Sequence, residues 1–441
     1  MGVMEGGGAG WFLAHWMTHG APPMDALAVD SRRFGSWADR DYRVAKAVEC
    51  FGLQFGVHYP NEERPAGRGL RLSPLHDMMV ERGAVMGAAY GWERPNWFSE
   101  TPEAEAEETF CRANWFDAVA QEVAAATNRV AMADLSVFSK FDVTGPDVAS
   151  FLEALGANHA VQPGRIGLTH ALTSAGGVLS EFTVTRLAPD HAYLTSAAAA
   201  EQIDFDLLTQ VAKGFEVTVS NVCEKLAVIG IMGPKSPDVL PELSDMPWLT
   251  ARETNVGGVH VRALRVSYLG ECGWELHVSK DQAVGLFTTL EEAAKPHGLG
   301  YYGAYAANSM RLEKGYRSWG SDLTTERSPL EAGLAPFVRK PLHAELTRDA
   351  AWDMVMLEIE AGEVDPFYAH TVWKDGLAVG IATSGAYGHR TGKVLALAYL
   401  RDPTAGDGLT ISILGRQRAA TILPSPPFDP NNLRLKTRGS K

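Results

Sequence analysis

Hydrophobic and polar positions recur with two different periods along the chain, which predicts a mixture of helices and strands. In five segments, bulky or apolar residues repeat at the three- to four-residue spacing of an amphipathic helix. These segments are residues 11–17, 41–55, 117–132, 147–155 and 202–213. Short alternating runs lie between and after them, so the pattern predicts helices interleaved with strands.

Strand-like alternation marks the middle and the end of the chain. Residues 135–143 form one such run, and residues 181–194 are typical of a hairpin that turns at Pro189-Asp190. Residues 350–423 are rich in strand signals, with turns expected at Asp375-Gly376, Gly385 and Ala405-Gly406. The fold class that we expect is therefore α+β, with a small antiparallel barrel or jelly-roll-like domain at the C-terminal end.

Residues 261–275 hold the most informative local pattern. Alternation as far as Tyr268 predicts a strand, and two glycines then predict a tight turn that carries Glu271 and Glu275. A flat heterocycle could stack on the aromatic ring while its N–H groups donate to a carboxylate. A pterin fits that description. The alternative is a solvent-facing hairpin with ordinary surface acids.

Composition and charge narrow the function classes. The chain has 441 residues, 46% of them apolar and 21% charged, which is long enough for two or three domains with cores of their own. Its formal net charge of −13 argues against a nucleic-acid-binding surface, because phosphate binding needs clustered Lys and Arg. We see no signal peptide, and no apolar run approaches the length of a membrane span.

Cysteine, histidine and glycine patterns argue against several other sites. The four cysteines are scattered without a CxxC pair, which favours reduced thiols and a cytoplasmic setting over disulfides or zinc. His15 and His19 have helical spacing but lack an adjacent glutamate, so we expect no metal site. The glycine-rich residues 6–10 lack the preceding strand of a dinucleotide-binding turn, so we expect no flavin or nicotinamide site within this chain.

An ordered set of motifs resembles the aminomethyltransferase family, the glycine-cleavage T-protein fold. The matching segments are residues 134–147, 176–184, 233–236, 311–317, 329–334 and 383–389. They run in order from about residue 105 towards the C-terminus, and Tyr268 and Glu275 match the family's folate contacts with the same seven-residue spacing. The resemblance implies a T-protein-like multidomain fold around a central folate cavity, with tetrahydrofolate as cofactor.

The N-terminal part resembles a narrower group. Residues 73–77 and 91–98 are similar to the dimethylglycine and sarcosine dehydrogenases and oxidases, in which a flavin-binding half is fused to a T-protein-like half. We therefore expect three parts: residues 1–105 as a linker-like segment, 106–345 as the folate-binding region and 346–441 as the barrel. The first part is expected to act as a structural tether or to dock a separate flavoprotein oxidase subunit.

The resemblance also assigns candidate residues. Glu181 stands where the family has a catalytic aspartate, and the longer side chain adds about 1.5 Å of reach. Leu168 stands where many relatives carry tyrosine, which removes a hydroxyl from the substrate pocket. The expected cofactor-binding residues are Tyr268, Glu271, Glu275, Arg311 and Tyr387, with His389 beside the last. For Arg311, a salt bridge to Glu313 or Glu331 is the alternative.

The function that follows from these expectations is transfer of a one-carbon unit to N5 of tetrahydrofolate. The donor is expected to be a methylated small amine that resembles dimethylglycine or sarcosine. Such transfer needs alignment of the donor carbon and stabilisation of a cationic donor, both within reach of a carboxylate. Two alternatives stay open: direct demethylation of a methyl ether or sulfonium compound, and a noncatalytic folate-binding subunit of a flavoprotein oxidase.

Overall fold

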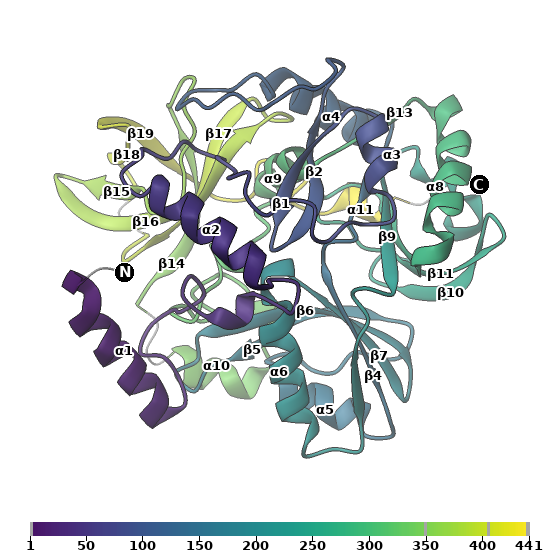
Figure 1. Ribbon diagram of the computed structural model, residues 1–441, viewed down its shortest axis with the longest axis horizontal. Helices are drawn as coiled ribbons and strands as arrows, with labels where there is room; N and C mark the ends of the chain where they lie inside the picture. The colour runs from purple at the N-terminus through teal and green to yellow at the C-terminus, as the bar shows by residue number, and fades with distance from the viewer. Residues whose placement is uncertain (1–2, 348–350, 404–405, 438–441) are drawn as a thin grey trace.

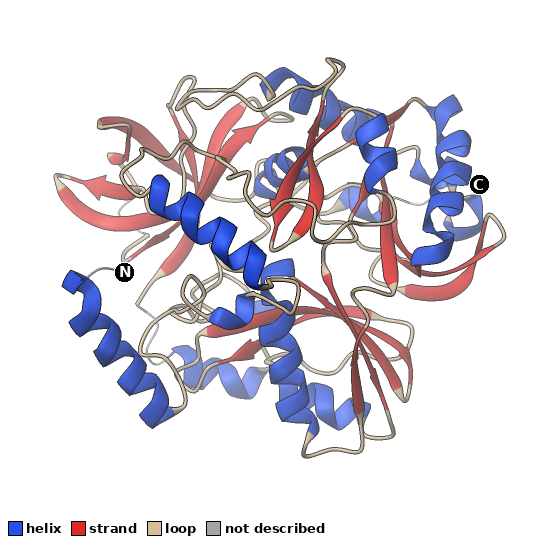
Figure 2. Ribbon diagram, viewed as in Figure 1, coloured by secondary structure: helices blue, strands red, loops and turns tan. Residues whose placement is uncertain are grey.

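Three β-structures surround a common centre, and most helices lie on the outside (Figures 1 and 2). The computed structural model describes residues 3–347, 351–403 and 406–437. The structure combines helices with sheets that are almost entirely antiparallel, so the α+β prediction is confirmed. No helix in these ranges is long and apolar enough to cross a membrane.

The N-terminal segment forms two surface helices and a buried hairpin. Helices α1 (Gly6–His19) and α2 (Arg40–Gly52) confirm the helical periodicity seen in the sequence, and neither has a buried residue. In Figure 1 they lie along the outside of the molecule, in purple. Helix α3 (His76–Glu81) leads into the hairpin of β1 (Ala84–Ala89) and β2 (Trp92–Phe98). Trp92 and Trp97 of β2 are buried, so the hairpin anchors this segment.

A six-stranded sheet forms the second part. Its strands, in spatial order, are β10 (Ala251–Val256), β11 (Val259–Leu264), β12 (Gly273–Ser279), β9 (Leu226–Met232), β3 (Val130–Asp134) and β13 (Leu299–Tyr301). All neighbours are antiparallel except β3 and β13. One face packs on α7 (Ser236–Val239) and α8 (Lys280–Ala294), and the β3 end of the other packs on α4 (Phe116–Asn128) and α9 (Ala304–Glu313).

Two predicted elements in this region were wrong at their ends. The helix expected as far as residue 132 ends at Asn128, because Val130–Asp134 is a strand buried on both faces and therefore shows no alternation. The strand expected as far as Tyr268 ends at Leu264. The guanidinium of Arg265, the next residue, is buried and donates to the carbonyl of Thr437 in the C-terminal segment.

A five-stranded antiparallel sheet forms the third part. Its spatial order is β5 (Ile166–Leu172), β6 (Val178–Ala188), β7 (His191–Ser196), β4 (Ser139–Thr144) and β8 (Thr218–Asn221). The hairpin of β6 and β7 turns at Pro189-Asp190, as predicted. Helices α5 (Val148–Leu155) and α6 (Glu201–Ala212) pack on one face around Phe141, Phe182 and Leu194. The opposite face of this sheet is turned towards the centre of the molecule.

The predicted C-terminal antiparallel barrel is confirmed. Its closed order is β14 (Asp353–Ile359), β17 (Lys393–Leu400), β16 (Leu377–Gly388), β15 (Thr371–Lys374), β18 (Leu409–Ile413) and β19 (Arg416–Leu423). The turn at Asp375-Gly376 is present, with both residues at positive φ. The turn expected at Gly385 is wrong: this residue lies inside β16, where a Cβ would come within 2.4 Å of Pro366. The turn predicted at Ala405 falls outside the described residues.

The barrel is joined to the rest of the chain at both ends. Helix α10 (Lys340–Thr347) precedes it, and α11 (Leu433–Lys436) follows it. Figure 1 shows α11, in yellow, between the barrel and the six-stranded sheet. Arg434 on this helix contacts Glu271 in the loop between β11 and β12. The C-terminal segment thus leads back from the barrel to the sheet.

Substitution of Gly177 by alanine should destabilise the fold. Gly177 lies at the turn into β6, and a Cβ there would come within 1.8 Å of the carbonyl oxygen of Thr325. Because that atom belongs to the backbone, the β5–β6 hairpin and the 324–327 loop must separate. We expect the free energy of unfolding, measured by urea denaturation, to fall by about 3 kcal/mol.

Gly285→Ala is the matched control. Gly285 lies in α8, and a Cβ added there would have no atom within 4 Å, so alanine should leave stability unchanged or raise it by up to about 1 kcal/mol. Equal stability of Gly177→Ala and the wild type would contradict the close packing of the hairpin on this loop.

Candidate functional site

Glu181 points towards the centre of the molecule from the hairpin of β5 and β6. Its neighbours on the strand, Ser180 and Phe182, face the helices behind the sheet. Because side chains alternate along a strand, Glu181 faces the opposite way. The register pairs it directly with His170, and 22% of its side chain is exposed. The carboxylate is thus held on a rigid strand and remains accessible.

His170 fixes one oxygen of this carboxylate. Its Nε2 lies 2.9 Å from Glu181 Oε2, and its side chain is completely buried. Among the described residues, His170 Nδ1 has no hydrogen-bond partner. Because a carboxylate oxygen accepts, Nε2 is the ring nitrogen that donates to Glu181.

Tyr268 lies beside this pair, on the loop between β11 and β12. Its hydroxyl donates to the carbonyl of Arg317 at 2.9 Å, and its ring stands nearly parallel to that of Tyr316, with centroids 6.2 Å apart. Burial of the hydroxyl end raises the pKa of Tyr268 to about 12, and the negative charge of Glu181 adds to the shift. The residue is still 41% exposed, so the ring presents a free surface next to the carboxylate.

Glu275 faces inwards from the six-stranded sheet. Its Oε2 lies 3.5 Å from His277 Nε2, and 21% of its side chain is exposed. The other nitrogen of that ring, Nδ1, lies 2.8 Å from the hydroxyl of Tyr193 on β7. Burial lowers the pKa of His277, which keeps the ring neutral near pH 7. The contact joins the inward faces of the two sheets, so each sheet presents a carboxylate with a buried histidine beside it.

The structure does not present Glu271 to a ligand. The residue is 1% exposed, and its two oxygens pair with Arg390 at 3.0 Å and Arg434 at 2.6 Å. Burial raises the pKa of Glu271, and the two guanidinium groups oppose that shift. Glu271 therefore ties the loop to the barrel and to α11, and its predicted place among the cofactor contacts is not supported by this geometry.

Arg311 is buried in an ion pair, although with a partner that the sequence did not indicate. Its guanidinium lies 2.8 Å from Asp322, which is fully buried. The hydroxyls of Thr383 and Ser384 on β16 donate to the same carboxylate. Glu313 pairs instead with Arg390, so the alternative proposed for Arg311 named the wrong acid.

Tyr387 and His389 line a cavity of about 180 Å³ between α4, α9, β16 and the 365–368 segment. Arg311 also reaches this cavity. Arg112 lies over the Tyr387 ring, at 4.2 Å from its centroid. Burial lowers the pKa of His389 to about 4, so it is neutral near pH 7. Two of the predicted cofactor residues, Arg311 and Tyr387, therefore lie at this cavity.

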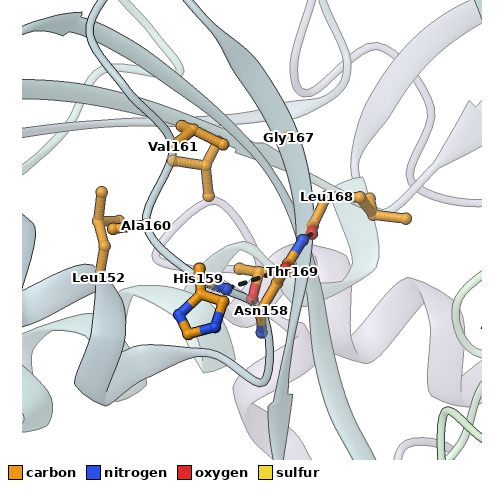
Figure 3. A pocket seen from close by; sticks show the side chains of 9 residues that line it. Leu152, Asn158, His159, Ala160, Val161, Gly167, Leu168 and Thr169 are labelled. Carbon is orange, nitrogen blue, oxygen red and sulfur yellow. Dashed lines mark hydrogen bonds between the residues drawn. The ribbon is translucent and has the colours of Figure 1, made fainter. Parts of the chain in front are cut away.

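Leu168 shares the inward face with Glu181. It is two residues from His170 on β5, and the register places it opposite Thr183. Figure 3 shows a second, much smaller pocket, and the side chain of Leu168 points away from it. That pocket has a volume of about 10 Å³, which is room for one water molecule at most. The leucine thus borders the site, where a tyrosine would have added a hydroxyl.

Two known protein families match most of the chain. Residues 75–341, more than half of the chain, match the GCVT N-terminal domain, and residues 353–429 match the Glycine cleavage T-protein C-terminal barrel domain. The chain belongs to the glycine cleavage T-protein family. This is a folate-dependent, aminomethyltransferase-like family related to dimethylglycine and sarcosine dehydrogenases. Residues 19–73 also match the FAD dependent oxidoreductase central domain.

Curated relatives cover the whole chain. It is 34% identical to mitochondrial dimethylglycine dehydrogenase from Homo sapiens, over 100% of this chain and 54% of that protein. It is 33% identical to 4-methylaminobutanoate oxidase (formaldehyde-forming) from Paenarthrobacter nicotinovorans, over 99% and 55%. The chain thus spans about half the length of these relatives. An aminomethyltransferase from Thermotoga maritima is 28% identical over 81% of this chain and 98% of its own.

A solved structure supports the fold. The glycine cleavage system aminomethyltransferase T from Bartonella henselae superposes with a TM-score of 0.70, over 82% of this chain and 99% of that one. The two chains are 21% identical, so this likeness concerns the fold alone.

Several residues of this candidate site were missed in the sequence. His170 could have been found from the register of the hairpin, which pairs it directly with Glu181. Asp322 and Arg317 lie in an irregular loop without periodic signal. Among the described residues, no group of three His, Cys, Asp or Glu side chains could hold a metal ion.

Replacement of Glu271 by glutamine should lower stability. The change removes the charge that Arg390 and Arg434 share, so the buried Arg390 keeps only Glu313 as a counter-ion. We expect a loss of about 2 kcal/mol in the free energy of unfolding, measured by urea denaturation, because hydrogen bonds to charged groups are weakened. Glu275→Gln is the control and should cost under about 1 kcal/mol, since this carboxylate is partly exposed. If the two variants were equally stable, the structural role of Glu271 would be refuted.

Proposed function

We propose that this protein transfers a one-carbon unit from a methylated small molecule to N5 of tetrahydrofolate. The observation that carries the proposal is the inward carboxylate of Glu181, held by His170 and placed next to the exposed ring of Tyr268. Membership of the T-protein family supports it from a separate direction.

The residues present fit tetrahydrofolate. The exposed Tyr268 ring offers a stacking surface for a pterin, and Glu275 offers a partly exposed carboxylate for its N–H groups. We propose these two as the main contacts. Arg311 and Tyr387 stay proposed contacts for the remainder of the cofactor, on the side of the aromatic cavity.

Tetrahydrofolate would supply the nucleophilic N5 that accepts the carbon. The protein would hold the donor by the negative charge of Glu181, which stabilises a cationic nitrogen or sulfur next to the transferred carbon. Glu181 Oε2 is held by His170, whereas Oε1 accepts no hydrogen bond within the described residues. Oε1 is therefore the atom that would accept the proton released when N5 bonds to the carbon, and it would return that proton to the amine that leaves when the donor carbon–nitrogen bond breaks.

We propose a methylated amine similar to dimethylglycine or sarcosine as the donor. The relatives include a dimethylglycine dehydrogenase and a 4-methylaminobutanoate oxidase, whose names refer to methylated amines. Leu168 makes the pocket next to Glu181 less polar than a tyrosine would. For that reason a methyl ether or sulfonium donor, which would give 5-methyl-tetrahydrofolate directly, remains the second candidate.

A separate flavoprotein oxidase is the proposed partner if the donor arrives as an oxidised amine. Helices α1 and α2 bury none of their residues, and Met17, Phe51 and Phe55 expose 77%, 74% and 92% of their surface. Exposed apolar side chains of this kind are suited to contact with another chain. The match of residues 19–73 to an oxidoreductase domain supports the chemistry of this partner. Under the remaining alternative, the chain only binds folate within such a complex.

Glu181→Gln should remove turnover while folate still binds. The protein is incubated with tetrahydrofolate and dimethylglycine labelled with ¹³C in its methyl groups, with and without an added amine oxidase, and the folate product is identified by mass spectrometry. We expect 5,10-methylene-tetrahydrofolate only with the oxidase, and a rate that is about 10²- to 10⁴-fold lower for the variant.

Each other result would change the proposal. Labelled 5-methyl-tetrahydrofolate formed without an oxidant would favour direct demethylation. An unchanged rate in Glu181→Gln would reduce the chain to a folate-binding subunit. Sulfonium compounds and methyl ethers serve as the comparison donors.

His170→Leu should reduce kcat without weakening folate binding. Loss of the Nε2 donor frees the Glu181 side chain to rotate, and displacement by about 1 Å can cost about 10²-fold in rate. His170→Gln retains an N–H donor and should recover part of the rate. His159→Leu, on an exposed histidine near the same strand, is the control. A folate Kd that changed as much as kcat would contradict a positioning role for His170.

A further inference from the structure

The aromatic cavity bordered by Tyr387 has features that folate binding at Glu181 does not explain. It lies between α4, α9, β16 and the 365–368 segment, with a volume of about 180 Å³. Six of the residues that line it are aromatic: Trp115, Phe116, Tyr305, Phe367, Tyr368 and Tyr387. Pairs of these rings contact each other, such as Trp115 with Tyr305 at 4.8 Å between centroids. The wall is therefore largely aromatic, and the cavity is large enough for a small organic molecule.

One carboxylate in this wall has no counterpart. Asp365 lines the cavity, and its Oδ1 is buried without a hydrogen-bond partner within the described residues. Its position is fixed, because the adjoining Pro366 packs against Gly385 of β16 so closely that a Cβ there would clash. Burial raises the pKa of Asp365 to about 6, against the opposing charge of Arg112, so the group is mostly ionised at pH 7. A desolvated, unpaired carboxylate costs free energy unless something with positive charge binds it.

The nearby cations do not pair with Asp365. The guanidinium of Arg112 lies over the rings of Phe116 and Tyr387, at 4.5 and 4.2 Å from their centroids, and its Nε is buried without a hydrogen-bond partner among the described residues. The guanidinium of Arg311 is committed to Asp322 and to Asn308. These placements stiffen the wall and leave the Asp365 carboxylate open to a ligand.

The cavity is separated from Glu181 by the Arg311–Asp322 ion pair. Asn308 and Ser384, which both bond to that pair, line the cavity on one side. On the other side, the same two charges act on the hydroxyl of Tyr268. The cavity and the Glu181 cluster are thus neighbours that share a polar wall.

We propose that this cavity binds a small methylated ammonium ion, with its charge against Asp365 and its methyl groups against the aromatic rings. A methylated ammonium cannot satisfy several hydrogen-bond acceptors, but it is attracted to π-faces and to a single carboxylate. An ordinary ammonium ion or a sugar would need several polar partners. The polar side chains of Asn308, Ser309 and Ser384 in the lining are already bonded to Arg311, the carbonyl of Tyr387 and Asp322. This binding site is separate from the donor site at Glu181, so the proposal does not rest on the proposed function.

Calorimetry on the whole chain without folate tests this binding. The probes are choline and dimethylglycine, which share a methylated nitrogen and differ in the rest, together with 3,3-dimethylbutan-1-ol, the neutral carbon isostere of choline. We expect saturable binding of both amines and roughly tenfold or more weaker binding of the isostere. Asp365→Asn should weaken choline binding by about tenfold or more, and Phe367→Leu, which keeps an apolar wall but removes a π-face, should weaken it several-fold.

Matched controls separate this result from that of the catalytic proposal. Asp353→Asn changes an exposed aspartate at the start of β14 and should bind choline as the wild type does. Glu181→Gln should also bind choline normally, even where it abolishes turnover, so either proposal can fail alone. The cavity proposal is overturned if neither amine binds, if the neutral isostere binds equally well, or if Asp365→Asn has no effect.

Discussion

The buried ion pair between Arg311 and Asp322 is the constraint on which the arrangement of this protein depends. It joins the end of α9 to the 316–323 loop, and the hydroxyls of Thr383 and Ser384 attach the barrel to the same carboxylate. The hydroxyl of Tyr399 on β17 donates to the backbone of Asp322 as well. Removal of one partner from such a pair typically costs about 3–5 kcal/mol, because the other charge is left buried. One fully buried carboxylate therefore holds the barrel against α9 and the loop that follows it, across 61 and 62 residues of sequence.

This pair also relates the two functional regions. Arg311 donates to the carbonyl of Tyr316, whose ring stands beside that of Tyr268. The position of the proposed pterin surface is thus coupled to the barrel through one guanidinium. A second buried network, in which Arg390 of the barrel bonds to Glu271 and Glu313, reinforces the same junction. The charged residues at this junction hold the parts of the protein in place. Glu181, Glu275 and Asp365 instead have accessible or unpaired oxygens, which are able to bind a ligand.

Much of the fold could be predicted from the sequence, and the predictions that failed did so for physical reasons. The surface helices α1 and α2 and the β6–β7 hairpin followed from periodicity and turn residues, because each is half exposed or ends at a clear turn. Strand β3 was missed because burial of both faces removes alternation. In the site, Glu181 and Tyr268 could be named from the family resemblance. Glu271 could not be distinguished from Glu275 by local pattern, since its partners Arg390 and Arg434 lie more than a hundred residues away. His170 needed the strand register, and Asp365 needed the cavity.

The closed barrel has a consequence for how other chains can approach this protein. A sheet with free edges can recruit a further strand through its backbone, whereas a closed ring of β14 to β19 has no unpaired edge to offer. Another chain that binds on that side of the molecule must therefore contact side chains and cannot pair with the backbone of the barrel. The barrel thus resists the addition of further strands, while the helices at the opposite end of the sequence leave several apolar side chains exposed.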